Sequence, residues 1–179
     1  MGKSEDTDLV QRSRAGDAQA FETLLIRYEK PVYNAAYRML GNADDASDVA
    51  QTVFLKAYEH LGDFNPKYRF FSWIYRIALN ESVNCLNKRS RTEELTREPE
   101  TETRGPDAAM EQEIRNRQIQ SALMTINSDY RTVIVLKHFM DCNYLEISEI
   151  LDIPTKTVKS RLYSGRQQLK EALAHRQHS

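Results

Sequence analysis

Apolar residues recur every three or four positions along most of this chain, which is the spacing of amphipathic helices. In the first half, Asp17 is the expected N-cap of a helix whose apolar face continues to Gly41. Apolar positions expected in the core include Leu24 on this helix, Val53 on the next and Ile114 later in the chain. The predicted helices cover residues 8–40, 44–61, 70–91, 113–124, 128–140, 143–151 and 154–174. The pattern therefore predicts an all-α protein.

Residues 92–113 interrupt this pattern. They contain eight acidic residues, two arginines, Pro99 and Gly105-Pro106, and almost no apolar residue before Met110. Such a segment cannot bury enough surface to fold alone, so we expect a flexible acidic linker. The prediction is two small helical domains, residues 8–91 and 114–174, joined by the linker 92–113.

Charge separates into blocks that the net charge of -1 conceals. Counted from the side chains, residues 65–91 carry +5, residues 92–113 carry -6 and residues 114–179 carry +4. Two basic segments on either side of an acidic one are typical of a protein with two DNA contacts.

No apolar run reaches transmembrane length, and the amino terminus lacks a signal-peptide core. We therefore expect a cytoplasmic protein that is not inserted in a membrane. Cys85 and Cys142 fit no metal spacing and are expected to be reduced, and the four histidines form no supported metal site. We expect neither a metal nor a cofactor.

Residues 153–174 form a helix with two different faces. Val158, Leu162 and Leu169 share the apolar side, and the opposite stripe is Lys156, Lys159, Tyr163, Arg166 and Lys170. A charged stripe of this kind fits either a solvated surface or a DNA contact.

The preceding short helix, 143–151, favours the DNA contact. Only Asp152 and Ile153 separate it from Pro154, and two helices joined by so tight a turn resemble a helix-turn-helix. In that geometry the residues pointing to base edges or phosphates are Lys159, Ser160, Tyr163 and Ser164, and those pointing mainly to the backbone are Lys156, Arg161 and Arg166.

The stretch 70–91 is expected to form a helix with Ser72 as its N-cap, and this helix carries a second polar stripe. Its members lie on one side of the helix and are Trp73, Arg76, Asn80, Asn84, Asn87 and Arg91, with Lys88 and Arg89 nearby. Asparagine amides donate and accept hydrogen bonds at base edges, and the cations neutralise phosphates. Trp73 fits a core position and a base-stacking position equally well.

Three motifs together resemble the extracytoplasmic-function (ECF) sigma factors, a type of bacterial RNA polymerase specificity subunit. The run EISEILDIPTKTVKSRLYSGRQQL resembles their region 4, DDASDVAQTVFLKAY their region 2.2, and FFSWIYRIALN their regions 2.3 and 2.4. The resemblance covers about residues 8–174.

This resemblance implies a role for each segment. Asp48 and Gln51, with Leu55 beside them, would contact the clamp helices of core polymerase. Trp73, Arg76, Asn80, Asn84, Lys88 and Arg91, with the loop 62–69 as a pocket wall, would capture one strand of the -10 element. The helix from Pro154 would read the -35 element, an anti-sigma factor would be a regulatory partner, and the acidic linker is either a solvated tether or a connector in the RNA exit path.

Departures from the family pattern concern single residues. Thr52 stands where many members carry an acid, and Asp141-Cys142-Asn143 replaces the commoner Glu-Gly-Leu-type turn. Asp152 replaces a turn residue that is usually glycine or similar, and Ser164-Gly165 replaces a frequent Arg-Ala pair. Asp tolerates a left-handed backbone, so we expect the turns to persist. Gly165 should cost about 1 kcal/mol relative to alanine in a helix.

Two other functions remain open at this level. A stand-alone helix-turn-helix regulator with a helical sensor domain would bind DNA without polymerase. An all-helical hydrolase would need a convergent set of histidines and carboxylates, which the sequence does not offer. We therefore expect a DNA-binding specificity subunit and not an enzyme.

Overall fold

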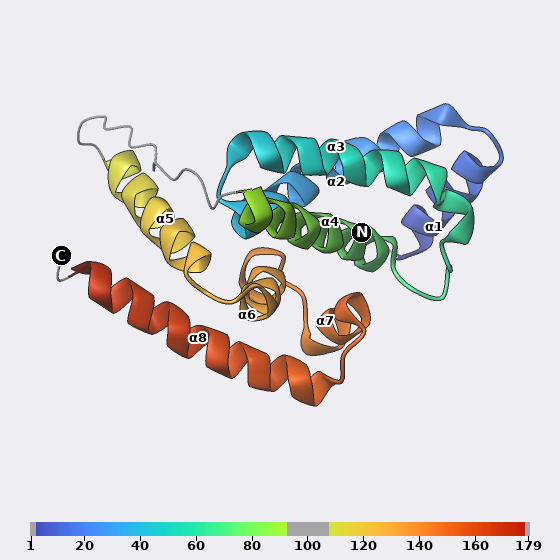
Figure 1. The fold of residues 1–179 in the computed structure, drawn as a ribbon. Coiled ribbons are helices and arrows are strands. Elements are labelled where there is room, and N and C mark those ends of the chain that lie inside the picture. The colour runs from blue at the N-terminus through green and yellow to red at the C-terminus, as the bar shows by residue number, and fades with distance from the viewer. Residues whose placement is uncertain (1–2, 93–107, 178–179) are drawn as a thin grey trace.

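The computed structural model describes residues 3–92 and 108–177 (Figure 1), and within these ranges every regular element is helical. The predicted all-α fold is confirmed. None of the described helices is both long and apolar enough to cross a membrane.

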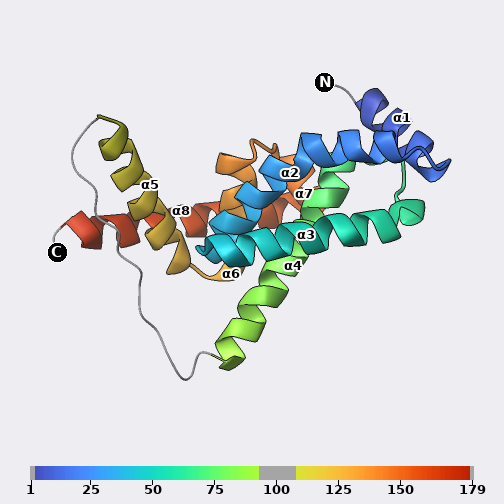
Figure 2. The same cartoon turned by 90° about the horizontal axis from the view of Figure 1, so that it is seen from above.

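The amino-terminal helices form one bundle. Its elements are α1 (Lys3–Arg14), α2 (Ala18–Leu40), α3 (Ala43–Glu59), the short 3-10 turn η1 (Leu61–Asp63) and α4 (Phe70–Thr92). Helices α2, α3 and α4 pack against one another, and α1 lies across the start of α2 (Figures 1 and 2). The predicted cap is confirmed, since the Asp17 carboxylate accepts from the backbone N–H groups of Gln19 and Ala20.

The apolar periodicity correctly located the core of this bundle. From α2 the buried side chains include Leu24, Val32 and Met39, and from α3 and α4 they include Val49, Val53, Ile74 and Leu79. Helix α2 runs through Pro31 without ending and stops at Gly41, whose φ of 69° is left-handed. Glycine adopts this conformation without a steric cost.

The carboxy-terminal helices pack beneath this bundle in Figure 1. They are α5 (Ala108–Met124), α6 (Ser128–Ile134), a π-helical turn η2 (Val135–Phe139), α7 (Tyr144–Leu151) and α8 (Thr155–Gln177). Helix α5 begins five residues before the predicted Glu113, within the expected linker. The rest of that acidic segment, residues 93–107, lies outside the described residues. Ile114, predicted to be buried, is 41% exposed.

The two turns of the carboxy-terminal helices form as expected. Asp141 (φ 54°) and Asp152 (φ 52°) both adopt the left-handed conformation. Asn143 caps α7 in a reciprocal capping box with Glu146, whose side chain accepts from the Asn143 N–H at 2.8 Å. Helix α7 is therefore held at both ends, and the helix-turn-helix is well defined.

Candidate nucleic-acid and polymerase interfaces

The polar stripe on α4 exists, but the cap expected for this helix is wrong. Helix α4 starts at Phe70, so Ser72 is not its cap; the Ser72 side chain is instead buried within the first turn. The remaining polar members of the stripe, Arg76, Asn80, Asn84, Asn87 and Arg91, are all exposed, as is the neighbouring Lys88. Helix α4 therefore presents three cations and three amides along this side.

The loop before α4 forms one wall of a cavity of about 770 Å³. From this loop Asp63, Phe64, Asn65 and Tyr68 line the cavity, and from α4 it is lined by Ser72, Trp73 and Arg76. The opposite wall belongs to the second domain and is formed by Ser148, Glu149, Asp152, Ile153 and Pro154. The cavity thus has both aromatic and hydrogen-bonding groups on its surface.

Trp73 is both a packing residue and part of the cavity wall, so it fits both of the interpretations that the sequence left open. Its ring packs against Phe64 and Phe70, with centroid separations of 5.5 and 5.6 Å, and it also lines the cavity. Phe70 and Tyr75 are buried and Phe71 is partly buried, as expected for packing residues. The aromatic cluster fixes the Trp73 ring, so a rigid indole stands at the cavity wall.

The second domain covers this side of α4. The Arg76 guanidinium donates to two backbone carbonyls, that of Glu149 and that of Ile150, the latter at 2.9 Å. These carbonyls lie at the end of α7, where the helix dipole favours a cation. Arg69 pairs with Glu146 at 3.1 Å in the same region. The carboxy-terminal turn of α7 therefore rests on the start of the polar stripe.

A second cavity of about 570 Å³ lies further along α4. Asn80 and Asn84 line it from the first domain, and Asp129, Thr132 and Arg161 line it from the second. Arg161 pairs there with Asp129 at 3.3 Å. Two amides assigned to -10 DNA thus face a residue assigned to -35 DNA, a proximity that the sequence did not predict.

The two domains are also joined by buried polar residues that sequence reasoning missed. The Gln120 side chain donates to the carbonyls of Tyr37 at 3.1 Å and Arg38 at 3.3 Å. Arg131 donates to Met39 O at 2.6 Å and, within its own domain, to Met124 O and Ile126 O. Burial lowers the pKa of the Arg131 guanidinium. Nothing in the sequence around Gln120 or Arg131 predicts that these polar side chains are buried. Their exposed fractions of 7% and 6% show that they belong to the contact between the domains.

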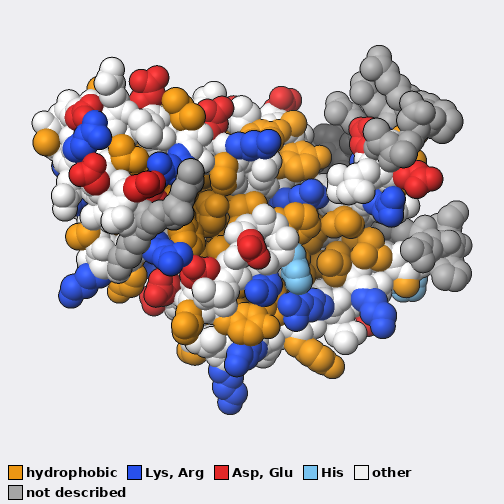
Figure 3. Space-filling view, turned by 180° about the vertical axis from the view of Figure 1, so that it is seen from behind, with side chains coloured by type: hydrophobic (Ala, Val, Ile, Leu, Met, Phe, Trp, Pro, Cys, Tyr) orange, Lys and Arg blue, Asp and Glu red, His pale blue; other side chains and the backbone are white. Residues whose placement is uncertain are grey.

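Helix α8 has the two faces expected from the sequence. Val158 and Leu162 are buried, and the stripe of Lys156, Lys159, Tyr163, Arg166 and Lys170 is exposed, with Tyr163 at 69%. Ser160 is also exposed, whereas Arg161 and Ser164 are half-buried beside the stripe. Figure 3 shows Lys and Arg side chains gathered along the lower edge of the molecule, over α8.

The outer face of α3 carries the three residues associated with polymerase. Asp48 and Gln51 are exposed, and Leu55 is 65% exposed, which is high for a leucine. Thr52, the departure from the family pattern, donates its hydroxyl to Asp48 O at 3.0 Å and so stays within its own helix. The face combines an acid, an amide and an apolar side chain and has no partner element in the described chain.

Neither a metal centre nor a disulfide is found within residues 3–92 and 108–177. No group of three or more His, Cys, Asp or Glu residues converges there in a metal-binding arrangement. Cys85 is half-buried and Cys142 buried, both as free thiols, and burial raises the pKa of Cys142 to about 12. Such a thiol is a poor nucleophile at neutral pH.

Known proteins resemble both halves of the chain. Residues 24–92 match the family Sigma-70 region 2, and residues 116–169 match Sigma-70, region 4. The chain is 35% identical to the ECF RNA polymerase sigma factor SigW of Bacillus subtilis, over 92% of this chain and 94% of that protein. It is 31% identical to the RNA polymerase sigma-H factor of Pseudomonas aeruginosa, over 97% of this chain and 96% of that protein.

A solved structure has the same arrangement of helices. It is CnrH in complex with the cytosolic domain of CnrY, with a TM-score of 0.75 and 25% identity over 96% of this chain and 98% of that chain. The sigma factor RpoE of Bartonella quintana, solved with the anti-sigma factor NepR, shares the fold at a TM-score of 0.71 and 21% identity, covering 88% of this chain and 98% of that chain.

Proposed function

Since the chain belongs to the ECF family of RNA polymerase sigma factors and directs transcription initiation, we propose that its two domains divide promoter recognition between them. The first domain, about residues 8–91, docks on core polymerase and captures one strand of the -10 element. The second, about residues 114–174, reads the -35 element. The protein acts where bacterial polymerase acts, in the cytoplasm.

The observation that carries the -10 assignment is the aromatic surface formed by the loop 62–69 and the start of α4. Phe64, Tyr68 and the fixed ring of Trp73 line this surface, which stays in the first domain when the second domain, the opposite wall of the cavity, moves away. Stacking on aromatic side chains and hydrogen bonds to amides offset the few kcal/mol that unstacking a base costs. Asn80 and Asn84 continue the contact along the strand, and Arg76, Lys88 and Arg91 neutralise its phosphates.

For the -35 element, α8 acts as the recognition helix. The residues that contact base edges or phosphates are Lys159, Ser160, Tyr163 and Ser164, and those that contact the DNA backbone are Lys156, Arg161 and Arg166. Five of these seven residues are exposed, and Arg161 is held by Asp129. We infer that Arg161 must leave this carboxylate before it contacts DNA.

The polymerase contact uses the outer face of α3. Asp48, Gln51 and Leu55 lie at helical spacing and are exposed together. An exposed leucine between polar groups supports a protein interface, because interfaces combine apolar anchors with hydrogen bonds at their rim.

The closed arrangement of the domains has a functional consequence. Arg76 is occupied by α7, and Asn80 and Asn84 face the second domain. A DNA strand cannot use these groups at the same time, so the domains separate when the protein binds polymerase and promoter. An anti-sigma factor is a fitting partner for the closed form, since the sigma factor RpoE, which was solved with the anti-sigma factor NepR, shares this fold over 88% of the chain.

The test is run-off transcription with permanganate footprinting, using purified protein, core polymerase and a promoter library. Asn80→Ala is compared with Asn34→Ala, which removes an exposed amide from α2 of the same domain. Lys159→Ala is compared with Lys30→Ala, which removes an exposed cation from α2. Asn80→Ala should reduce strand opening roughly tenfold and Lys159→Ala should weaken -35 binding, while both controls behave as wild type.

The assay also separates the alternatives. Equal loss in Asn80→Ala and Asn34→Ala would refute the strand-capture role of α4. If the protein bound duplex DNA alone but never gave initiation with core polymerase, it would act as a stand-alone regulator.

A further inference from the structure

Arg14, at the end of α1, reaches across to the loop that walls the larger cavity. Its Nε donates to Leu61 O at 2.9 Å, and one Nη donates both to Gly62 O at 3.0 Å and to Phe64 O. One guanidinium thus binds three carbonyls within four residues. Arg14 is distant from this loop in sequence, and neither the helical pattern nor the family motifs drew attention to it.

The carbonyls that Arg14 binds belong to the turn whose buried residues fix the backbone of the loop. Leu61 and Phe64 are buried, at 5% and 3% exposure, and form the ends of the turn that follows α3. Hydrogen bonds within the loop are local, as in Asp63 N–H to His60 O and Tyr68 N–H to Asn65 O. Arg14 therefore ties a locally bonded loop to a separate helix.

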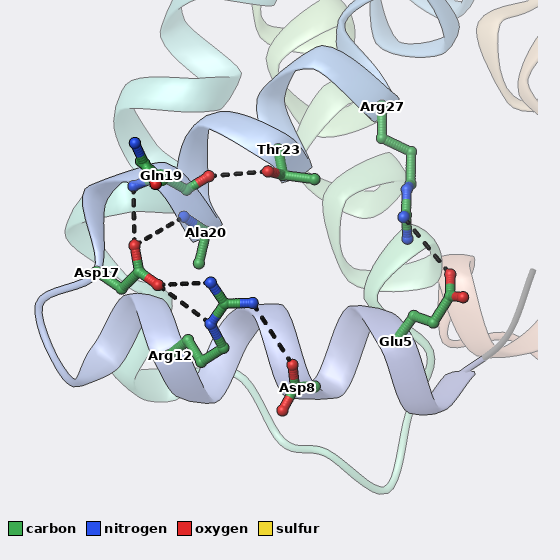
Figure 4. A network of polar contacts seen from close by, with 8 residues as sticks. All are labelled: Glu5, Asp8, Arg12, Asp17, Gln19, Ala20, Thr23 and Arg27. Carbon is green, nitrogen blue, oxygen red and sulfur yellow. Dashed lines mark hydrogen bonds and ion pairs between the residues drawn. The ribbon is translucent and has the colours of Figure 1, made fainter.

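Helix α1 is itself anchored near both of its ends. Near its start the Asp6 carboxylate, 8% exposed, accepts from the Tyr28 hydroxyl at 2.5 Å and from the Arg27 guanidinium. Near its end Arg12 binds the Asp17 carboxylate through two nitrogens, at 2.7 and 3.1 Å (Figure 4). Because Asp17 also caps α2, the end of α1 is fixed to the bundle and Arg14 projects from a rigid support.

The loop that Arg14 holds carries part of the cavity wall. Phe64, Asn65 and Tyr68 line the cavity, and the Phe64 ring packs on Trp73. A shift of the Phe64 carbonyl would move this ring and with it the aromatic surface offered to a base. We propose that Arg14 is a positioning residue that keeps the loop 61–64 in the shape required to accept an unstacked base; the inference rests on the strand-capture role proposed above.

The planar fork of arginine is what this position requires. A guanidinium directs several N–H groups in fixed directions, so it can bind three carbonyls at once. A lysine ammonium keeps the charge but concentrates its donors at one point, and it cannot reproduce the same set of bonds. Arg14→Lys therefore separates geometry from charge.

The test uses holoenzyme assembled with the full chain. The probe is the -10 single strand of a promoter that wild-type holoenzyme opens, with one abasic site introduced at each position in turn. The quantity measured is the Kd of the abasic strand divided by the Kd of the intact strand. Wild type should show a ratio of about ten or more at one position, because stacking of a base on aromatic groups is lost there.

In Arg14→Ala and Arg14→Lys this ratio should fall to roughly two, while binding through phosphates persists. The matched control is Lys30→Ala, which removes an exposed cation from α2 of the same domain and leaves the anchors of α1 in place. It should keep the wild-type ratio. If Arg14→Ala does not fold, Arg14→Lys decides.

Two results would overturn the inference in different ways. A wild-type ratio in the folded Arg14 variants would show that the loop keeps its shape without the guanidinium, and only the role of Arg14 would be lost. A ratio near one at every position in the wild-type protein would remove the strand-capture role itself, and the role of Arg14 with it.

Discussion

Replacing Gln120 by alanine should loosen the closed arrangement of the two domains without touching any residue assigned to polymerase or DNA. Gln120 lies on α5 and is 7% exposed. Its amide nitrogen donates to Tyr37 O and Arg38 O, and its amide oxygen accepts from the Arg38 guanidinium at 3.2 Å. All three bonds cross from the second domain to the end of α2.

The expected magnitude follows from these bonds. A hydrogen bond contributes about 1 kcal/mol net, and the three distances of 3.1–3.3 Å lie at the long end of the normal range. Tyr37 O also accepts from the Gly41 N–H at 2.8 Å, so it keeps a partner in the variant. We expect closure to weaken by about 2 kcal/mol, which is roughly a thirtyfold change in the ratio of closed to open molecules.

The assay compares Gln120→Ala with Gln118→Ala, an exposed glutamine on the same helix. Energy transfer between dyes at the exposed positions Glu29 and Gln167 reports the separation of the domains. A binding site available only in open molecules has its apparent affinity reduced by the open fraction. Gln120→Ala should therefore increase the separation and raise the affinity of the free protein for a -10 single strand, by up to about thirtyfold.

The same change should have little effect on the holoenzyme, where polymerase already holds the domains apart. If Gln120→Ala and Gln118→Ala gave the same energy transfer and the same strand affinity, the Gln120 bonds would not stabilise closure. That outcome would refute the argument from these contacts.

Three further predictions concern single sites. In an exposed helix, Gly→Ala raises the free energy of unfolding by about 1 kcal/mol, but Gly165→Ala should not, because the added Cβ would lie 2.9 Å from Ile134 Cδ1. Urea unfolding measures this free energy, and the full increase would contradict the prediction. At about pH 8 a thiol reagent should label Cys85 before Cys142, because burial raises the pKa of Cys142 to about 12 and hides the thiol. Equal labelling rates of the two cysteines in the folded protein would contradict this prediction. Burial, and then Arg166, lower the pKa of His138 from its ordinary value of 6.5. Its contribution to stability should therefore be complete above about pH 6.5 and be lost as the pH falls below that value and through the lowered pKa of the folded state. Melting curves of wild type and His138→Gln should converge in acid, and a constant difference would refute this prediction.

The apolar periodicity determined the helices and most of the core because both depend on residues close together in sequence. It correctly placed Leu24, Val53 and Leu162 inside and the stripe of α8 outside. It failed at Ile114, an apolar position at helical spacing that is 41% exposed. It also misassigned Ser72, because Phe70 and Phe71 already belong to α4.

Local side-chain chemistry also determines the helix ends. Asp17 caps its helix as predicted, Asn127 and Asn143 are found as caps of theirs, and Asp141 and Asp152 take the left-handed conformation. Each of these outcomes is decided by one side chain and the few backbone groups next to it. The family motifs added the order of the domains and the residues proposed for polymerase and DNA.

Only the tertiary structure decided which polar groups meet between elements that are distant in the sequence. Nothing in the sequence pairs Arg76 with the end of α7, Gln120 with the end of α2, or Arg14 with the loop 61–64. In each case a side chain binds backbone carbonyls, and a carbonyl is present at every residue whatever its side chain. The sequence by itself therefore determined the helices, their caps and the exposed faces, whereas the partners of these buried and bridging side chains followed from how the helices pack in space.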